Sequence, residues 1–275
     1  MRVENQIENG TDSKKSNGLS RMVYLMAPFI GIGIMLILWF SASAANPQAF
    51  PNPSAVLLLL YDLLFHPLSG YTLLGHVAIS LRRVCIALFF AMLVGIPLGI
   101  LMGWSRLMRA TVGTLFECIR PIPVLAWIPL MIMWFGIGEK AKIIMIFIGA
   151  LMPIVVNSYT GIKLVSPLYL DVGRMFNASS QSKLLLKIVL PAALPTIFAG
   201  IRNATSMSLM VVLAAEMLAA KSGLGFMINR GMEAYNMTLV MSGMVAIGVT
   251  GAMLSILTNM IERRICPWNS HTKSE

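Results

Sequence analysis

Ionisable residues inside apolar segments are the first candidates for chemistry in this sequence. Glu117 and Arg120 stand three positions apart in FECIRPIPVLAWIP, so on a helix they would share one face. Arg202 and Glu216 lie in a second apolar stretch, 192–218. Charged groups at membrane depth are rare, and they pair with one another or line a polar path. Three interpretations are therefore open: a mutual Glu117–Arg120 ion pair, side chains that extend to the cytoplasmic edge of the membrane, or an Arg120 guanidinium that guides an anion.

Arg202 and Glu216 each have more than one candidate role. We expect Arg202 either to extend its side chain toward the membrane surface or to pair with Glu117. Glu216 is followed by the turn KSGLG at 221–225. Its carboxylate can face the mouth of a cavity, contact a partner protein or cap that turn.

Three prolines follow Arg120 closely, at Pro121, Pro123 and Pro129. A proline removes a backbone donor and bends a helix, and membrane helices tolerate this where neighbours or a cavity satisfy the backbone. We predict a bent or unwound helix here, with exposed backbone lining a cavity. Trp127 either lines that cavity or packs against other helices. The predicted path through the membrane comprises Glu117, Arg120, Pro121, Pro123, Trp127, Arg202 and Glu216.

Signatures of catalysis and metal binding are missing from the sequence. The sequence has three histidines, His66, His76 and His271, and no HExxH, GxSxG or clustered Cys/His pattern occurs in it. GIGEKAK at 136–142 lacks the GxxxxGK[ST] spacing of a nucleotide-binding loop. We therefore predict a non-catalytic chain with no cofactor or metal of its own.

The composition is that of a membrane protein. Hydrophobic residues make up 57% of the 275 residues and charged residues 12%, about half the charged share of soluble domains. The net charge of +10 does not indicate nucleic-acid binding, because no basic stripe with aromatic residues accompanies it. We predict an all-α membrane protein with six transmembrane helices. The apolar segments lie at 22–44, 79–102, 111–135, 141–161, 192–218 and 237–261.

The distribution of Lys and Arg predicts the orientation. Six spans put both termini on one side, which carries thirteen of these residues against four in the opposite loops. The positive-inside rule therefore places both termini in the cytoplasm. Between Pro53 and Pro67, an apolar stretch too short to span is expected to lie as a helix at the outer surface. The expected parts are a disordered tail at 1–20, a transmembrane domain at 21–265 with its core at about 76–262, and a tail at 266–275.

A polar segment on the predicted cytoplasmic side, about 162–190, contains DVGRMFNASSQSKLLLKIVL. Asp171 favours a helix N-terminus there through the helix dipole, and the run from Asn177 can end that helix and cap a second one. Behind it, an apolar stripe of Leu184, Leu185, Ile188 and Val189 opposes Lys183 and Lys187. We predict a short helix on the membrane surface that offers small residues to a partner's groove. A plain amphipathic connector is the alternative.

The end of this segment resembles the cytoplasmic signature of ABC importer permeases. That signature reads EAA, three residues, Gly, nine residues, an aliphatic residue, any residue and Leu-Pro, and KIVLP matches its end at Leu190-Pro191. Two alignments of its beginning are open. EAA corresponds either to Asp171-Val172-Gly173, with Asn177, Ala178 and Ser179 as Gly-Ala-Ser, or to Val172-Gly173-Arg174, with Ala178 as the glycine. We favour the first, because it keeps the acidic residue.

Longer stretches extend the resemblance over about residues 50–268. RPIPVLAWIPLMIMWFGIGE at 120–139, LPAALPTIFAGIRNA at 190–204 and AAEMLAAKSGLGFMI at 214–228 resemble the nitrate/sulfonate/taurine-type permeases, in the family's order. The resemblance implies a type I ABC importer permease in the lipid of the inner membrane, acting as a homodimer on a small anionic or zwitterionic solute. Its implied partners are two cytoplasmic ATPase subunits, which hold ATP and Mg, and a periplasmic or lipid-anchored solute-binding protein.

The resemblance also implies a role for the short cytoplasmic helix, which would dock in a cleft of the ATPase subunit. Gly173 and Ala178 would then let the two backbones approach. The implied coupling residues are Asp171, Val172, Gly173, Arg174, Asn177, Ala178, Ser179, Leu190 and Pro191. The competing hypothesis is a secondary transporter or channel without an ATPase partner, but the sequence shows no internal repeat of the kind that many secondary transporters carry.

Overall fold

The computed structural model describes residues 26–27, 29–175 and 180–268. The chain divides into two compact units, one ending at Leu58 and the other starting at Leu59. In the first unit, Phe29–Ala45 is an apolar helix. The stretch between Pro53 and Pro67 forms α2 (Pro53–Phe65), which confirms the helix predicted there.

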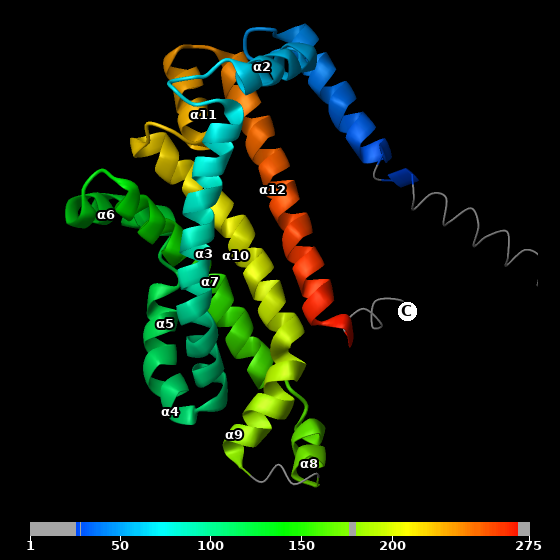
Figure 1. Cartoon of the computed structure of the whole chain (residues 1–275), viewed down its shortest axis with the longest axis vertical. Coiled ribbons are helices and arrows are strands. Elements are labelled where there is room, and N and C mark those ends of the chain that lie inside the picture. The colour runs from blue at the N-terminus through cyan, green and yellow to red at the C-terminus, as the bar shows by residue number, and fades with distance from the viewer. Residues whose placement is uncertain (1–25, 28, 176–179, 269–275) are drawn as a thin grey trace, which may run out of the picture. The chain divides into compact units, whose positions relative to one another are not determined.

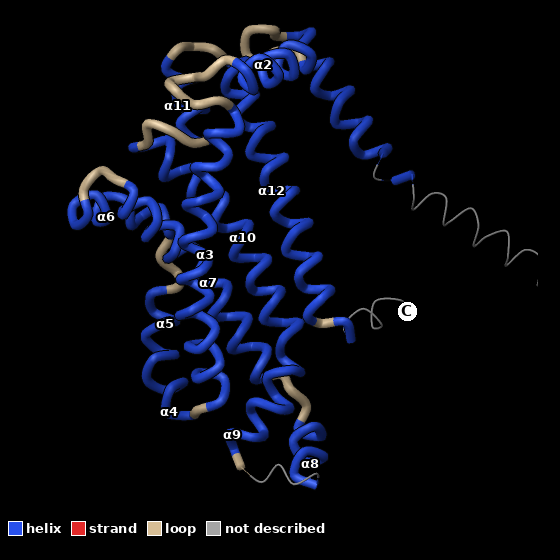
Figure 2. The backbone as a smooth tube through the Cα atoms, viewed as in Figure 1, coloured by secondary structure: helices blue, strands red, loops and turns tan. Residues whose placement is uncertain are grey.

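The second unit is built from helices of very different lengths, joined by short connections (Figures 1 and 2). Its α-helices are α3 (Leu73–Trp104), α4 (Arg106–Met108), α5 (Thr114–Ile119), α6 (Ile128–Phe135), α7 (Glu139–Lys163), α8 (Pro167–Met175), α9 (Gln181–Leu184), α10 (Leu190–Ala219), α11 (Leu224–Glu233) and α12 (Met237–Ile265). Two π-helical turns, η1 (Arg109–Gly113) and η3 (Leu185–Val189), and the 3-10 turn η2 (Val124–Trp127) continue these helices. No named strand occurs in the described ranges, so the all-α class is confirmed.

The number of membrane-spanning helices is only partly settled. Within the described residues, four helices are long and apolar enough to cross a membrane: α3, α7, the continuous helix Gln181–Leu218 and α12. A bent pair of shorter helices raises the number to five. Phe29–Ala45 is a shorter apolar helix, and the predicted first span, 22–44, also includes residues outside the described ranges. The count of six is therefore not confirmed.

Glycines bring α3 and α7 into close contact. Three of them, spaced four residues apart, lie on one face of α3. The pairs are Gly95 with Ile154, Gly99 with Ser158 and Gly103 with Ile162. A Cβ added at Gly99 would lie 2.5 Å from the Cβ of Ser158 and 2.6 Å from the carbonyl oxygen of Val155. Small residues let membrane helices approach each other in this way, so van der Waals packing holds the pair together.

The predicted third span is broken. Arg106–Ile119 and Val124–Phe135 are inclined by 84°, and α6 projects to one side of the long helices (Figure 1). Pro121 and Pro123 lie in the break, which confirms the bend predicted from the prolines. Pro129 instead occupies the first turn of α6, a position where a proline costs no backbone hydrogen bond.

The long helices define two ends of the second unit. In Figure 1, α8 and α9 lie at one end and α11 lies at the other. We call these the α8–α9 end and the α11 end. Each end carries a different group of polar residues, and a cavity lies beside the broken helix.

Candidate functional site

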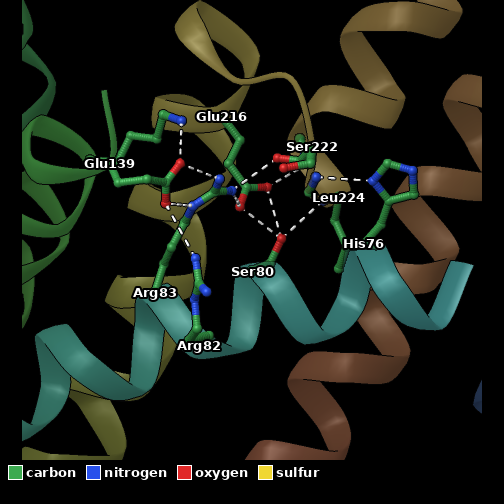
Figure 3. Close-up of polar contacts among 11 residues, drawn as sticks. His76, Ser80, Arg82, Arg83, Glu139, Glu216, Ser222 and Leu224 are labelled. Atoms are coloured by element: carbon green, nitrogen blue, oxygen red, sulfur yellow. Dashed lines mark hydrogen bonds and ion pairs between the residues drawn. The ribbon is translucent and has the colours of Figure 1, made fainter. Parts of the chain in front are cut away.

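A buried polar cluster at the α11 end joins α3, α7 and α10 (Figure 3). Arg83 donates two hydrogen bonds to Glu139, from Nε to Oε2 at 2.7 Å and from Nη2 to Oε1 at 2.6 Å. Its Nη1 donates to Glu216 Oε1 at 2.5 Å and to the carbonyl oxygen of Ser222 at 2.9 Å. Only 2% of Arg83 and 1% of Glu216 is exposed. One guanidinium therefore bridges two carboxylates and the turn that follows α10.

The same cluster holds that turn through backbone amides. Ser80 Oγ lies 2.8 and 2.9 Å from the two Glu216 oxygens and accepts a bond from the Leu224 N–H at 2.9 Å. The Gly225 N–H donates to Glu216 Oε2 at 2.9 Å. The Gly223 N–H donates to Nδ1 of His76 at 3.0 Å. This nitrogen must therefore be the acceptor, and the ring is neutral with its proton on Nε2.

Helical spacing explains why these side chains meet. His76, Ser80 and Arg83 stand four and three residues apart, so they share one face of α3. Gly223 has a φ of +121°, and a Cβ there would overlap the Glu216 carboxylate. Only glycine combines this backbone conformation with room for the carboxylate.

Both carboxylates of the cluster are paired with cations. Lys142 Nζ lies 2.9 Å from Glu139 Oε1 and the exposed Arg82 lies 4.0 Å from Glu139 Oε2, so together with Arg83 three cations face two carboxylates. A buried ion pair is tolerated only with good geometry and further hydrogen bonds, both of which are present here. Among the described residues, no group of three or more His, Cys, Asp or Glu side chains could hold a metal. The polar groups of the cluster thus bond to one another, and the cluster connects α3, α7 and α10 structurally.

A second polar group lines a cavity of about 390 Å³ between the broken helix and α7. Glu117 and Arg120 form an ion pair at 3.5 Å, with 65% and 49% of their side chains exposed. Arg109 also lines the cavity, but it donates to the carbonyl oxygens of Met102 at 3.3 Å and Gly103 at 2.8 Å. Arg109 therefore ties the end of α3 to the turn η1, while the Arg120 pair stays open.

A larger groove, of about 790 Å³, runs between α3 and α12 and has a very different lining. Leu81, Val249, Met253 and Leu257 are typical of its side chains. Thr250 also lines the groove, but its hydroxyl group already donates to the carbonyl oxygen of Ala246 at 2.7 Å. Such a surface suits lipid or another apolar helix face, so the smaller cavity is the candidate for a charged solute.

At the α8–α9 end, the polar loop forms two helices. Asp171 and Arg174 pair at 3.0 Å on the exposed face of α8. Gly173 is buried, and a Cβ added there would overlap Ile188 and lie 3.1 Å from Leu184. Asn177, Ala178 and Ser179 lie outside the described residues.

These features can be compared with known proteins. A family model described as "Binding-protein-dependent transport system inner membrane component" matches residues 95–270. This chain belongs to that family. It is 34% identical over 260 residues to the taurine transport system permease protein TauC of Escherichia coli (strain K12), covering 93% of both chains. It is 33% identical over 265 residues to the nitrate import permease protein NrtB of Synechocystis sp., covering 92% of this chain and 94% of the relative.

A solved structure supports the fold of this permease. The chain is similar to one from the MetNI methionine ABC transporter in an inward-facing conformation, with a TM-score of 0.59 and 20% sequence identity. The match covers 68% of this chain and 92% of that one. The type I importer-like architecture and the role as an ABC importer permease, both expected from the sequence, are confirmed.

Two expectations about pathway residues of the permease need correction. Arg202 pairs with Glu262 of α12 at 2.7 Å and not with Glu117, because its side chain points across to the neighbouring long helix. Glu216 does not face a cavity mouth, since it is buried; it accepts the Gly225 N–H and so caps the turn, as the third alternative proposed. Trp127 packs against the core formed by α3, α7 and α10, which fits the packing alternative.

Gly173 faces its own loop. A side chain there would overlap Ile188, so the glycine makes room for internal packing, while its approach to a partner's backbone stays a prediction. The predicted stripe is confirmed, because Leu184 and Val189 are buried while Lys183 and Lys187 are exposed. Helix α8 begins at Pro167, four residues before the predicted start. Leu190 and Pro191 lie inside the continuous helix Gln181–Leu218, where the turn η3 passes into α10, so the predicted start of a separate span at Pro191 is wrong.

Sequence reasoning missed most of the buried cluster. Arg83, Glu139, Ser80 and His76 were not among the predicted site residues, although Glu216 was. The usable signal was the common helical face of His76, Ser80 and Arg83 inside an apolar segment. Nothing local in GIGEK indicates that Glu139 meets Arg83, because 56 residues separate them.

Proposed function

We propose that this permease passes a small anionic or zwitterionic solute, of the nitrate or sulfonate class, into the cytoplasm when a separate ATPase hydrolyses ATP. The observation that carries the substrate class is the similarity to permeases named for taurine and nitrate over more than nine-tenths of the chain. Both solutes present negatively charged oxygens. A cavity with the open Arg120 guanidinium in its wall supports this class.

The α8–α9 end is the proposed docking site of the ATPase. Lys183 and Lys187 are exposed there, together with Met175, of which 84% is accessible. A helix with an apolar contact point beside cations fits a groove with an acidic rim. Because Gly173 and Ile188 lock α8 onto η3, the docking surface comprises the exposed side chains Val172, Arg174 and Met175.

We further propose the orientation and the remaining partners. The positive-inside count favours the α8–α9 end in the cytoplasm, with both termini on that side. The α11 end then faces the solute-binding protein, and a second copy of the permease completes the path. ATP-driven closure of the ATPase pair would move α8 and α9 as a rigid lever and rock the long helices between two arrangements.

Uptake by reconstituted vesicles tests this proposal. The permease, purified with its ATPase and binding protein, is placed in liposomes, and uptake of nitrate and of taurine is measured with and without ATP. We expect ATP-dependent uptake of at least one of them, and none without the binding protein. Uptake by the permease alone, driven by an ion gradient, would establish the secondary transporter instead. Lys183→Glu together with Lys187→Glu should weaken ATPase binding. Lys140→Glu serves as the control, because Lys140 lies in the first turn of α7, away from the α8–α9 end.

A further inference from the structure

We infer that the Glu117 carboxylate competes with the solute anion for the guanidinium of Arg120. This competition makes the cavity beside Arg120 a weak, transient binding site on the solute's path to the cytoplasm. This inference rests on the proposed function. The cavity volume of about 390 Å³ lies within the usual range for small-molecule sites, about 300–1,000 Å³. Its place supports a transit role, because its wall includes the break in a membrane helix.

The charges of the cavity single out Arg120 as the group that meets an anion. Arg109 is already committed to two carbonyl oxygens at the end of α3, where the helix dipole is negative. Thr114 also lines the cavity, but its hydroxyl donates to the carbonyl oxygen of Ala110 at 2.8 Å. Among the described residues, Arg120 pairs only with Glu117, at 3.5 Å and on the same helix. An incoming oxyanion therefore displaces the Glu117 carboxylate from Arg120, and this carboxylate stays nearby because it belongs to the same helix.

Such competition has a clear use in transport. A site that conducts must bind well enough to admit the solute and weakly enough to release it. Arg120 alone, half-exposed in the wall of the cavity, would hold an oxyanion more firmly than it does beside Glu117. Because Glu117 is one helical turn away, its carboxylate pairs with the Arg120 guanidinium again as the solute leaves. The re-formed ion pair offsets part of the free energy that is lost when the solute dissociates.

The size of the effect follows from Coulomb's law. An anion on Arg120 would lie roughly 6 Å from the Glu117 carboxylate, and at an effective dielectric constant of about 40 their repulsion corresponds to about a tenfold change in affinity. Glu117→Gln removes this repulsion with little change in shape. It should therefore tighten anion binding about tenfold and slow turnover at saturating solute, whereas Arg120→Gln should abolish the site.

The test combines binding and transport. Nitrate and taurine are titrated onto the full-length permease in nanodiscs, with binding followed by thermal stabilisation relative to chloride; uptake is then measured in the complete complex. The controls for the binding titration are Arg230→Gln and Glu233→Gln, from an i,i+3 pair at 3.3 Å with similar exposure on α11. We expect both controls to bind anion as the wild type does, and each variant to melt as the wild type does without anion.

Each outcome decides something. A half-saturating concentration that falls about tenfold in Glu117→Gln, with binding lost in Arg120→Gln, supports the inference. Unchanged binding in Glu117→Gln overturns it, whatever Arg120→Gln does. Weaker binding in Glu117→Gln would make Glu117 a ligand of the solute's ammonium group and not a competitor, and would also overturn it. If the wild-type complex imports neither solute, the proposed substrate class fails; the binding titration is read independently of that result.

Discussion

Arg83 is the residue whose loss should most damage the folded permease. Its guanidinium makes bonds to Glu139 and to Glu216, and it touches the turn at Ser222. Arg83→Gln leaves Glu216 buried, with Ser80 and the Gly225 N–H as its remaining partners in the described part of the chain. Glu139 is less affected, because it is part-exposed and keeps Lys142.

The expected cost follows from this geometry. Removing one partner of a buried ion pair costs about 3–5 kcal/mol, because the other charge stays buried and uncompensated. For a chain of this size, each kcal/mol lowers the melting temperature by roughly 2–4 °C. We therefore expect Arg83→Gln to melt roughly 6–20 °C below the wild type. Glu216→Gln should cost less, about 1–3 kcal/mol, since Arg83 keeps Glu139.

The assay is thermal unfolding of the purified permease in nanodiscs, followed by tryptophan fluorescence and by loss of the monodisperse species. Arg82→Gln is the matched control, because Arg82 is the adjacent arginine, is 66% exposed and lies 4.0 Å from Glu139. An exposed pair contributes about 0–1 kcal/mol, so this variant should melt within a few degrees of the wild type. Equal melting of the Arg83 and Arg82 variants would refute the reasoning. The Arg83→Gln/Glu216→Gln double variant should lose less than the sum of the two single losses.

Three further predictions concern packing and reactivity. Gly99→Leu should prevent close packing of α3 on α7 and lower the yield of folded permease, whereas Gly248→Leu, which meets nothing within 4 Å, should be tolerated; size-exclusion profiles compare the two. Gly173→Leu should displace Ile188 and uncouple ATP hydrolysis from uptake without loss of membrane insertion, and normal solute-stimulated hydrolysis would contradict this. Burial and the nearby Glu262 carboxylate raise the pKa of the Cys266 thiol, so its maleimide labelling, scored by mass spectrometry, should be slow at pH 7 and rise as the pH increases; a pH-independent rate would speak against it.

The sequence predicted those parts of the fold that depend on local pattern. Apolar runs indicated the long helices, and the closely spaced Pro121 and Pro123 indicated the break between α5 and α6. The buried cluster was out of reach, because Arg83 and Glu216 are 133 residues apart and only the packing of α3 beside α10 brings them together. The packing of Ile188 against Gly173 was out of reach for a related reason: which side chain fills the space beside a glycine depends on tertiary contacts.

The two arginine–glutamate groups of this permease show how burial separates structural from functional charge. Arg83 and Glu216 are almost fully buried, so breaking their pair leaves a buried charge uncompensated at a cost of about 3–5 kcal/mol, which any solute that broke it would have to offset. Glu117 and Arg120 are half-exposed at i,i+3 spacing, where a pair contributes only about 0.3–0.5 kcal/mol. A solute can separate this second pair at little cost to the fold. Glu117→Gln should therefore leave the melting temperature almost unchanged, so that an altered turnover in this variant reports on the passage of the anion and not on damage to the helix bundle.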